Sequence, residues 1–256
     1  MSYNLQQGTP GLRSRLATAA AGAVIGVSSL MASAPATADF MKQSGFANGS
    51  LTVQVTRPTD VVQNVNAGGF SGFYSAVQAN LASSPLLNYC IELAQTFNFG
   101  TEYNNYSTVA VASAPNTLNG GSGMGIAKAN DLARMLGNGR FADSFTSTAK
   151  TVAMQLAIWE VVHELAGNAY SLASGGFQLN TNVDDAIDGA TGFAATYLSF
   201  TSSGTAAQLV ALTSVQGNPN SGNQDFITVV PVPPSAALLG TGLLFGLWTA
   251  RRRRKA

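Results

Sequence analysis

Polar and hydrophobic residues alternate in the first half of the chain and take on a longer period in its second half. From Leu51 to Ala112 the apolar residues alternate with polar ones or come in short runs, separated by Asn, Gly, Ser and Pro. This pattern is typical of short strands joined by turns. Gly68, Gly69 and Gly72 fall within the region, and we expect bends or bulges at these glycines.

The apolar positions follow a helical period between residues 125 and 165. We predict one helix at Ile126–Leu136 and another at Lys150–Ala166, because each is followed by a glycine that suits a C-terminal cap. A third helix is predicted from Asp184 toward Tyr197. The closing segments, Leu209–Ser214 and Phe226–Val230, again have the pattern of strands. The sequence therefore predicts a single α+β domain with a β-rich frame and an inserted helical section.

The first 38 residues have the organisation of a secretory signal peptide. Two arginines form a basic region, residues 16–31 are uncharged and rich in Ala, Val, Leu and Gly, and small residues occupy positions 36–38. Such a segment is removed during export and does not belong to the folded domain. We expect cleavage after residue 38, with a site after residue 34 as the alternative.

The C-terminal end has the pattern of a single transmembrane helix. Residues 235–250 carry no charge and are rich in Leu, Ala and Gly, and five basic residues follow at once: Arg251, Arg252, Arg253, Arg254 and Lys255. A helix of this length spans about 24 Å, a little less than the hydrocarbon core, and the arginines can compensate for the difference. Since basic residues stay on the cytoplasmic side, we expect the preceding domain outside the cytoplasm.

A proline-rich break stands directly before this apolar segment. It consists of Val230, Pro231, Val232, Pro233 and Pro234. The order of proline motif, apolar helix and basic tail resembles the PEP-CTERM family of C-terminal sorting signals, whose commonest motif is Pro-Glu-Pro. The resemblance implies that an exosortase-type transpeptidase recognises and cuts the chain near these prolines.

A plain C-terminal membrane anchor is the alternative interpretation of the same segment. In either case we expect a signal peptide at residues 1–38, an exported domain at residues 39–228 and a membrane-sorting segment at residues 229–256. The predicted location is the cell envelope or the cell surface.

The exported part of the chain is mildly acidic. Between residues 39 and 230 there are six basic and twelve acidic residues, a net charge of −6. This balance lacks the basic footprint of a nucleic-acid-binding protein. A single cysteine excludes an internal disulfide. Gly120–Gly123 lacks the Lys-Ser/Thr sequel of a phosphate loop, and Asp184, Asp185 and Asp188 suit a helix N-terminus better than a calcium loop.

Two short segments carry the candidate chemistry. Cys90 stands between an aromatic residue and an apolar-acidic pair, and 65 residues later Gln155 begins the segment Gln-Leu-Ala-Ile-Trp. Together they resemble the Cys–Gln thioester domains of bacterial surface adhesins, whose second motif is Thr-Gln-x-Ala-Ile-Trp. The chain has Met154 in place of the threonine. The resemblance covers residues 69–167 directly.

The resemblance implies an internal thioester between Cys90 and Gln155. A cysteine thiolate is a good nucleophile, and a glutamine carboxamide held against it can be attacked with loss of ammonia. The fold must hold the two groups at reaction distance and keep water away. A lysine amine on a target surface then displaces the sulfur. Because nothing is turned over, the resemblance implies a covalent adhesin or matrix cross-linker, not an enzyme, and no cofactor.

Four further residues are expected to support this pair: Tyr89, Glu92, Trp159 and His163. On a helix, Trp159 follows Gln155 by four residues, and Val162 or His163 follows by three or four more, so one face is expected to carry the glutamine toward the cysteine. Trp159 is expected to form an apolar wall beside the bond. Tyr89 is expected to pack or hydrogen-bond on the opposite face of its strand, and Glu92 is a candidate for orienting the site.

Other interpretations of these residues remain open. His163, the only histidine, either assists proton transfer or is packed as an ordinary core or surface residue. Glu160 and Glu164 are expected to face solvent or to cap neighbouring groups. The chain is alternatively a structural envelope or extracellular-matrix protein in which Cys90 is an unmodified thiol. A third possibility is a Cys–His hydrolase or acyl transferase with Cys90 as nucleophile and His163 as base.

Overall fold

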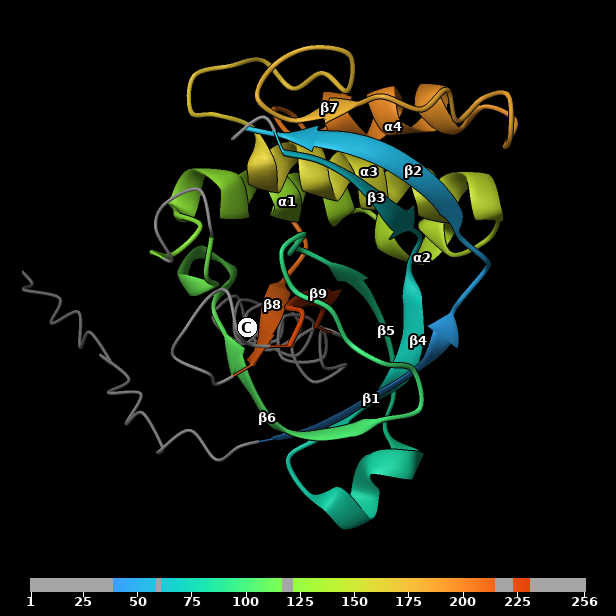
Figure 1. The fold of residues 1–256 in the computed structure, drawn as a ribbon. Helices are drawn as coiled ribbons and strands as arrows, with labels where there is room; N and C mark the ends of the chain where they lie inside the picture. Colours follow the sequence, from blue (N-terminus) through green and yellow to red (C-terminus); the bar gives the residue numbers. More distant parts are fainter. Residues whose placement is uncertain (1–38, 59–60, 117–121, 215–222, 231–256) are drawn as a thin grey trace, which may run out of the picture. The chain divides into compact units, whose positions relative to one another are not determined.

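The alternating segments of the sequence form a closed antiparallel barrel. In the computed structural model, which describes residues 39–58, 61–116, 122–214 and 223–230, six strands close in the order β1-β4-β5-β9-β8-β6 (Figure 1). Their bounds are Asp39–Phe46 for β1, Phe70–Ser75 for β4, Pro85–Cys90 for β5, Glu102–Val109 for β6, Leu209–Ser214 for β8 and Phe226–Val229 for β9. Strand β1 closes the barrel because it pairs with both β4 and β6.

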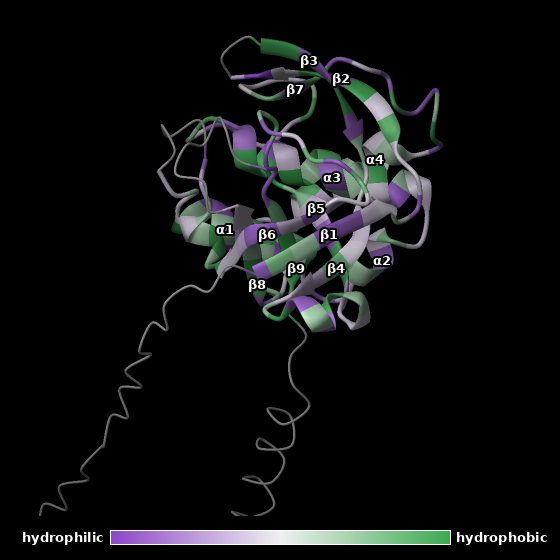
Figure 2. Cartoon of the chain, turned by 60° about the horizontal axis from the view of Figure 1, so that its bottom comes forward, coloured by the Kyte–Doolittle hydropathy of each residue, from purple (hydrophilic) through white to green (hydrophobic). Residues whose placement is uncertain are grey.

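Large side chains from four strands meet in the barrel core. Met41, Phe70, Tyr106 and Phe226 are almost fully buried. The ring centroids of Phe70 and Tyr106 lie 5.6 and 6.2 Å from that of Phe226. Figure 2 shows hydrophobic and hydrophilic residues following each other along the barrel strands. This alternation fixes the register, because a slip by one residue would turn the buried side chains outward.

A bulge in β1 shapes the barrel next to β4. Gln43 pairs with Gly72 and Gly45 pairs with Ser71, so β1 has one extra residue at this point. Gly72 gives the bulge room, because a Cβ atom there would collide with the carbonyl oxygen of Lys42. The irregularity predicted at Gly72 is therefore present, as a bulge in its partner strand.

The helical section lies between β6 and β8 in sequence and at one end of the barrel in space (Figure 1). It contains α1 at Ile126–Leu136, α2 at Arg140–Ser144, α3 at Thr148–His163 and α4 at Ala190–Ser199, while short 3-10 helices occupy Gln78–Ser83 (η1) and Val111–Ser113 (η2). Every residue of α3 from position 151 to 163 is buried. A helix that is buried all round packs on several sides, and α3 contacts the barrel and the three other α-helices.

A second sheet, ordered β3-β2-β7, covers the helical section. Its strands are Leu51–Arg57 (β2), Val61–Ala67 (β3) and Gln178–Leu179 (β7). In Figure 1, β2 and β3 run across α3. Val53 and Val55 of β2 are fully buried and belong to the same hydrophobic core as α3. One continuous core therefore joins the barrel, the helices and the second sheet.

The predicted helix at Ile126–Leu136 is confirmed at both ends. Helix α3 begins two residues earlier than predicted, where the side chain of Ser147 accepts a hydrogen bond from the backbone N–H of Lys150 (3.3 Å). It ends at His163, three residues earlier than predicted, because the backbone is already extended at Glu164.

Helix α4 begins at Ala190, so the predicted start at Asp184 is wrong. Residues 184–189 form turns, and Gly189 adopts a positive φ of 74° just before the helix. Asp184 Oδ1 accepts a hydrogen bond from the backbone N–H of Thr191 (2.8 Å). The acidic cluster thus contributes a cap to the first turn of α4, as its position near a helix N-terminus predicts.

The coarse prediction of an α+β domain with a β-rich frame and a helical section is confirmed. Strand β1 and the five-residue helix α2 were not predicted. The predicted signal peptide at 1–38, the glycines at 120–121 and the predicted membrane segment at 235–250 lie outside the described residues. Within the described part of the chain, no helix is both long and apolar enough to cross a membrane.

Candidate functional site

Strand β5 and helix α3 bring Cys90 and Gln155 into direct contact. The backbone N–H of Cys90 donates to Gln155 Oε1 (3.0 Å), and Gln155 Nε2 donates to the carbonyl oxygen of Cys90 (2.8 Å). Both residues are fully buried. Two hydrogen bonds therefore fix the glutamine carboxamide beside a cysteine from which it is separated by 65 positions in sequence.

The barrel leaves these backbone groups of Cys90 free for the glutamine. The pairing of β4 with β5 starts with Phe73 opposite Pro85 and ends with Phe70 opposite Asn88. On the other side, β9 pairs with β5 as far as Cys90. Beyond Asn88, none of the described strands continues the pairing on the β4 side. Since a buried backbone N–H or C=O needs a hydrogen bond, the carboxamide takes the place of a neighbouring strand.

The thiol of Cys90 lies against the turn that follows β5. Cys90 Sγ donates to the carbonyl oxygen of Glu92 (2.6 Å) and accepts from the backbone N–H of Glu92 (3.2 Å). Burial raises the pKa of the thiol, and the Glu92 backbone and the Trp159 indole offset only part of this rise. The resting thiol is therefore protonated. Glu92 orients it through its main chain.

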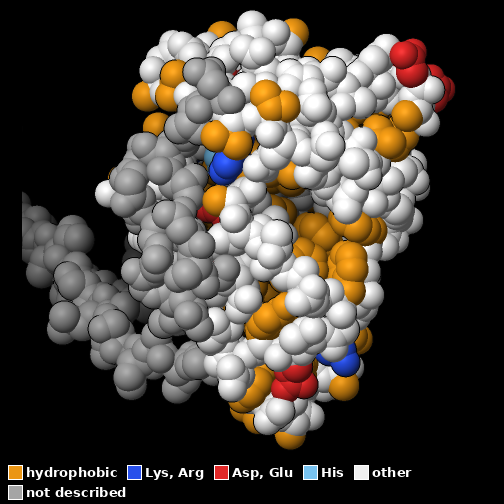
Figure 3. Space-filling model, viewed as in Figure 1, with side chains coloured by type: hydrophobic (Ala, Val, Ile, Leu, Met, Phe, Trp, Pro, Cys, Tyr) orange, Lys and Arg blue, Asp and Glu red, His pale blue; other side chains and the backbone are white. Residues whose placement is uncertain are grey.

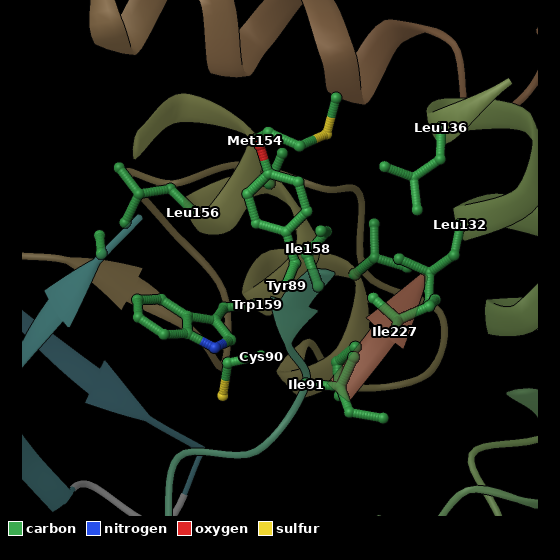
Figure 4. Close-up of a cluster of buried hydrophobic side chains, with 14 of the residues drawn as sticks. Tyr89, Cys90, Ile91, Leu132, Leu136, Met154, Leu156, Ile158, Trp159 and Ile227 are labelled. Atoms are coloured by element: carbon green, nitrogen blue, oxygen red, sulfur yellow. The ribbon is translucent and has the colours of Figure 1, made fainter. Parts of the chain in front are cut away.

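Trp159 packs beside Cys90 from helix α3, one turn after Gln155 (Figure 4). The tryptophan is 2% exposed, and its indole nitrogen is turned toward the cysteine (Figure 4). The indole N–H acts on the Cys90 sulfur, whose pKa it lowers, and it has no other hydrogen-bond partner among the described residues. The indole N–H is therefore directed at the sulfur and can also serve an acceptor that forms beside it.

A pocket of about 460 Å³ borders Cys90 and Trp159. Its aromatic lining comes from Phe46, Phe70, Phe97 and Phe99, and its neutral polar lining from Gln63, Asn64, Asn66, Gln95 and Gln224. None of the described residues that line it carries a charge. Figure 3 shows hydrophobic atoms gathered in a hollow on one face of the molecule. The buried pair thus borders a space of the size that small ligands occupy.

Two buried carboxyl groups lie near the cysteine. Glu92 Oε1 accepts from the backbone N–H groups of Leu93 (3.0 Å) and Ala94 (3.1 Å), and Asp225 Oδ1 accepts from that of Ser214 (2.9 Å). Burial raises the pKa of Glu92. Burial, with a smaller contribution from Glu92, raises the pKa of Asp225 to about 7. Sequence reasoning missed Asp225, because only the pairing of β9 with β5 brings it here.

Tyr89 points to the opposite side of β5 from the cysteine and ties the barrel to the helices. Its hydroxyl shares hydrogen bonds with Ser144 Oγ of α2 (2.7 Å) and Thr151 Oγ1 of α3 (3.2 Å). Thr151 Oγ1 also accepts from the backbone N–H of Gly69 (2.9 Å). These contacts hold α3 against β5 and so position Gln155, one turn further along the helix.

His163 lies at the C-terminal end of α3, where its ring stacks on Phe177 with 6.3 Å between the centroids. Burial, with smaller contributions from Lys128 and Arg57, lowers the pKa of the imidazole to about 3. An interaction with the Ile91 backbone raises this pKa, but by less than burial lowers it. The imidazole is neutral, and no hydrogen bond joins it to Cys90. Of the three helix positions predicted to share a face, Gln155 and Trp159 reach the cysteine.

Glu160 and Glu164 are buried, so of the two predicted settings, solvent or the capping of neighbouring groups, the first is wrong. Their exposed fractions are 0% and 1%. The Glu164 carboxylate accepts from the backbone N–H of Gly176 (2.8 and 3.0 Å) and from three further donors. Glu160 Oε1 accepts from the backbone N–H of Ser171 (2.7 Å). The physical reason is the segment 165–177, which folds back over the helix end and needs acceptors for its N–H groups.

Val230 is the only residue of the predicted sorting motif within the described part of the chain. Its backbone N–H donates to the carbonyl oxygen of Gln208 (2.9 Å), just before β8. The remaining residues of the motif, Pro231, Val232, Pro233 and Pro234, and the basic residues Arg251, Arg252, Arg253 and Arg254 lie outside the described residues. The barrel therefore ends where the predicted sorting segment begins.

The site offers a buried sulfur, a carboxamide fixed beside the cysteine backbone, an indole N–H directed at the sulfur and an uncharged pocket. Among the described residues, no group of three or more His, Cys, Asp or Glu side chains is placed to hold a metal ion. Comparison of the chain with protein-family models, with curated proteins and with solved structures gives no match.

Proposed function

We propose that this chain is an exported surface protein that attaches covalently to amines through an internal thioester between Cys90 and Gln155. The observation that carries the proposal is the pair of hydrogen bonds between the Gln155 carboxamide and the Cys90 backbone. They hold the carboxamide of Gln155 against the backbone of the residue that carries the sulfur. Holding two reactants in this way removes much of the entropic cost of joining them.

The proposed bond forms by a balanced exchange. Cys90 Sγ attacks the carboxamide carbon of Gln155, a C–S bond forms, the C–N bond breaks, and the thiol proton leaves with the nitrogen as ammonia. The thioester carbonyl oxygen then needs a hydrogen-bond donor, and the buried indole N–H of Trp159, which acts on the Cys90 sulfur, is a donor in the right place. Burial of both residues protects the product from water.

A target amine consumes the thioester in a second exchange. The amine nitrogen attacks the acyl carbon of Gln155, the C–S bond breaks, and the thiol of Cys90 is restored. The target remains joined to the chain through an amide at Gln155. Because the bond forms once and is not released, the protein acts as an adhesin or a matrix cross-linker and not as an enzyme.

Export and membrane sorting complete the proposal. The pattern of residues 1–38 supports a signal peptide, and the proline, apolar and basic segments after residue 229 resemble the PEP-CTERM sorting signal. The partner implied is an exosortase-type transpeptidase at the membrane. Replacing Pro231, Pro233 and Pro234 by alanine should block processing in cells that contain such an enzyme, and fractionation should then find the longer chain in the membrane.

Intact mass spectrometry tests the thioester. The purified protein should be lighter than its sequence by one ammonia, and methylamine should add to it at Gln155, as located by peptide fragmentation. The Cys90→Ala variant, processed in the same way, should show neither change. If the mass matches the sequence and the unfolded protein contains one full equivalent of free thiol, the covalent mechanism is lost.

A structural surface protein without a thioester is the second candidate. The observation in its favour is that Gln155 and the thiol already have hydrogen-bond partners and that burial raises the thiol pKa, so the unreacted pair is stable. The same mass measurement separates the two candidates. The Cys–His hydrolase has no comparable support, because no hydrogen bond joins His163 to Cys90 and the ring is stacked on Phe177.

A further inference from the structure

Another pocket, which we call the α4 pocket, lies in the helical section. Its volume of about 670 Å³ is within the range of small-ligand sites, and it shares no lining residue with the pocket that borders Cys90. Its walls come from the segment 170–182, which contains β7, and from α4. Figure 1 shows β7 and α4 on the same side of α3. None of the described residues that line the α4 pocket carries a charge.

The floor of the α4 pocket is apolar and its rim is polar. Leu172 and Leu198 are each only 8% exposed and belong to the hydrophobic core. Asn180, Asn182 and Ser199 are exposed and surround the opening. A sugar ring has the same division, because its C–H groups form apolar faces and its hydroxyl groups stand at the edge. The pocket and a sugar ring therefore match in their distribution of polar groups.

Tyr170 supplies the aromatic surface of the α4 pocket, and its position is fixed. Its hydroxyl donates to Asp131 Oδ2 (2.7 Å), and Asp131 forms an ion pair with Arg134 (2.5 Å). Arg134 also donates to the carbonyl oxygen of Thr201, another lining residue. Aromatic rings carry partial negative charge on their faces, which suits the C–H groups of a sugar. Because these contacts place the ring in advance, little entropy is lost when a ligand packs on it.

The asparagines of the rim keep hydrogen-bonding groups for a ligand. Asn180 donates through Nδ2 to Thr56 Oγ1 (2.8 Å), so its side-chain oxygen can accept. Asn182 accepts at Oδ1 from the backbone N–H of Asp184 (3.2 Å), so its amide nitrogen can donate. The rim thus presents an acceptor and a donor in set orientations. A hydroxyl group, which both donates and accepts, can use both.

An extended peptide is a poorer occupant, because the backbone N–H groups at β7 are already used. The N–H of Leu179 donates to the carbonyl oxygen of Leu172 (2.8 Å), and the N–H of Asn180 donates to that of Gln54 in β2 (2.8 Å). A peptide that adds a strand needs free main-chain groups along an edge. A charged compound would lose its water without gaining a counter-charge.

We propose that the α4 pocket binds a neutral saccharide. The C–H face of a sugar ring packs on Tyr170 and the leucines of the floor, and its hydroxyl groups meet the asparagines of the rim. The site is separate from the Cys90–Gln155 pair and does not depend on the proposed thioester. It gives the chain a means of recognising a glycan without a covalent bond.

Binding of the full chain, held in detergent, to immobilised polysaccharides tests the proposal. The Cys90→Ala background excludes a thioester, and about 0.5 M salt screens the basic residues at 251–255. In biolayer interferometry the chain should bind at least one of dextran, laminarin and galactomannan, which are neutral, and should not bind alginate, which is anionic. Binding to none of the neutral polysaccharides, or equal binding to alginate, would overturn the proposal.

Two variants at neighbouring positions of α4 show whether this binding uses the pocket. Ala195 lines the pocket and Thr196 does not, and both residues are exposed. Ala195→Trp fills the pocket and should weaken binding about tenfold or more, whereas Thr196→Trp should leave it unchanged. Thermal unfolding should give similar midpoints for both variants, because neither position is in the core. Equal polysaccharide binding by the two variants would place the saccharide elsewhere.

Asn182→Asp tests the rim without disturbing the turn before α4. It keeps the oxygen that accepts from the Asp184 N–H but replaces the amide donor by a carboxylate, so binding should weaken about tenfold. Tyr170→Ala should weaken binding more than Tyr170→Phe, which keeps the ring and loses only the hydrogen bond to Asp131. Unchanged binding by Asn182→Asp and Tyr170→Ala would contradict the proposal.

A peptide competitor separates the two classes of ligand. An Asn-Gly-Ser-Thr peptide with blocked ends should not displace the chain from the neutral polysaccharide, whereas the same polysaccharide in solution should. Displacement by the peptide that Ala195→Trp abolishes would mean that the pocket takes a peptide, and the saccharide assignment would be wrong.

Discussion

The middle and the C-terminal end of helix α3 carry buried polar side chains in contrasting settings. Near its middle, Gln155 is hydrogen-bonded to Cys90 of the barrel, and this cysteine borders a pocket. At its C-terminal end, Glu160, His163 and Glu164 are equally buried, but the segment 165–177 covers them and the carboxylates hold its N–H groups. Burial of polar groups therefore does not distinguish a reactive site from a structural one. A pocket that gives access to the buried group distinguishes the two.

The largest effect on stability is expected at the C-terminal end of α3, which the segment 165–177 covers. Glu164→Ala removes the acceptor for the backbone N–H of Gly176 and for three other donors. Buried donors that lose their partner each carry a desolvation cost, so we expect a loss of about 3 kcal/mol or more. Chemical unfolding followed by Trp159 fluorescence in the Trp248→Phe background measures it.

Glu164→Gln is the matched control for this prediction. It keeps an acceptor oxygen at the same place and should cost clearly less than the alanine variant. Methylamine labelling of the folded fraction should be unchanged in both, because Glu164 does not border the pocket. A loss below about 1 kcal/mol for Glu164→Ala would mean that water satisfies the 165–177 segment as well as the carboxylate does.

A smaller loss of stability is expected when the hydrogen bonds between Gln155 and the backbone of residue 90 are removed. In the Cys90→Ala background no thioester can form, yet the backbone groups of residue 90 still pair with Gln155. Adding Gln155→Ala leaves a buried N–H and C=O without partners, so it should cost about 2 kcal/mol more in the same unfolding measurement. An additional loss near zero would show that the carboxamide does not hold β5 to α3.

The pH dependence of stability compares the C-terminal end of α3 with the surroundings of Cys90. Burial raises the pKa of Glu160, at the C-terminal end of α3, to about 8 and that of Asp225, near the cysteine, to about 7. Each carboxyl binds its proton more tightly in the folded chain than in the unfolded one, so stability is lost as the pH rises from the ordinary carboxyl pKa to the raised value. Unfolding free energies should therefore fall between about pH 5 and about pH 8.

Two amide variants show how much of this pH dependence comes from Glu160 and how much from Asp225. Glu160→Gln should flatten the part of the slope that reaches to about pH 8, and Asp225→Asn the part that ends near pH 7. Only Asp225→Asn should also alter the pH dependence of methylamine labelling, because Asp225 interacts with the Cys90 thiol. An unchanged slope in the double variant would place the titrating groups elsewhere.

The local pattern of hydrophobic and polar residues was sufficient to predict most of the helices and strands. Ile126–Leu136 was predicted at both ends because its apolar period and its terminal glycine agree. The short-strand pattern after Leu51 became β2 to β6. The motif resemblance placed Cys90 and Gln155 together, and the structure brings the two residues into contact.

Non-local contacts explain what the sequence did not predict. Glu160 and Glu164 look like solvent-facing residues because a helix pattern says nothing about the segment 165–177 that folds back over them. Asp225 gave no signal, since strand pairing alone brings it near the cysteine. The four phenylalanines of the pocket come from β1, β4 and the turn after β5, and no sequence spacing joins them.

The smallest effect is expected on the face of β5 that points away from the thiol. Tyr89→Phe removes a hydroxyl that shares hydrogen bonds with Ser144 and Thr151 but leaves the ring packed between Phe141 and Phe145. Ser144 and Thr151 keep other partners, so the loss should be about 1 kcal/mol. Ammonia loss and methylamine labelling should not change. If labelling slows while the unfolding free energy barely moves, the hydroxyl sets the position of α3 closely enough to control the Cys90–Gln155 reaction, and the two faces of β5 then act as one site.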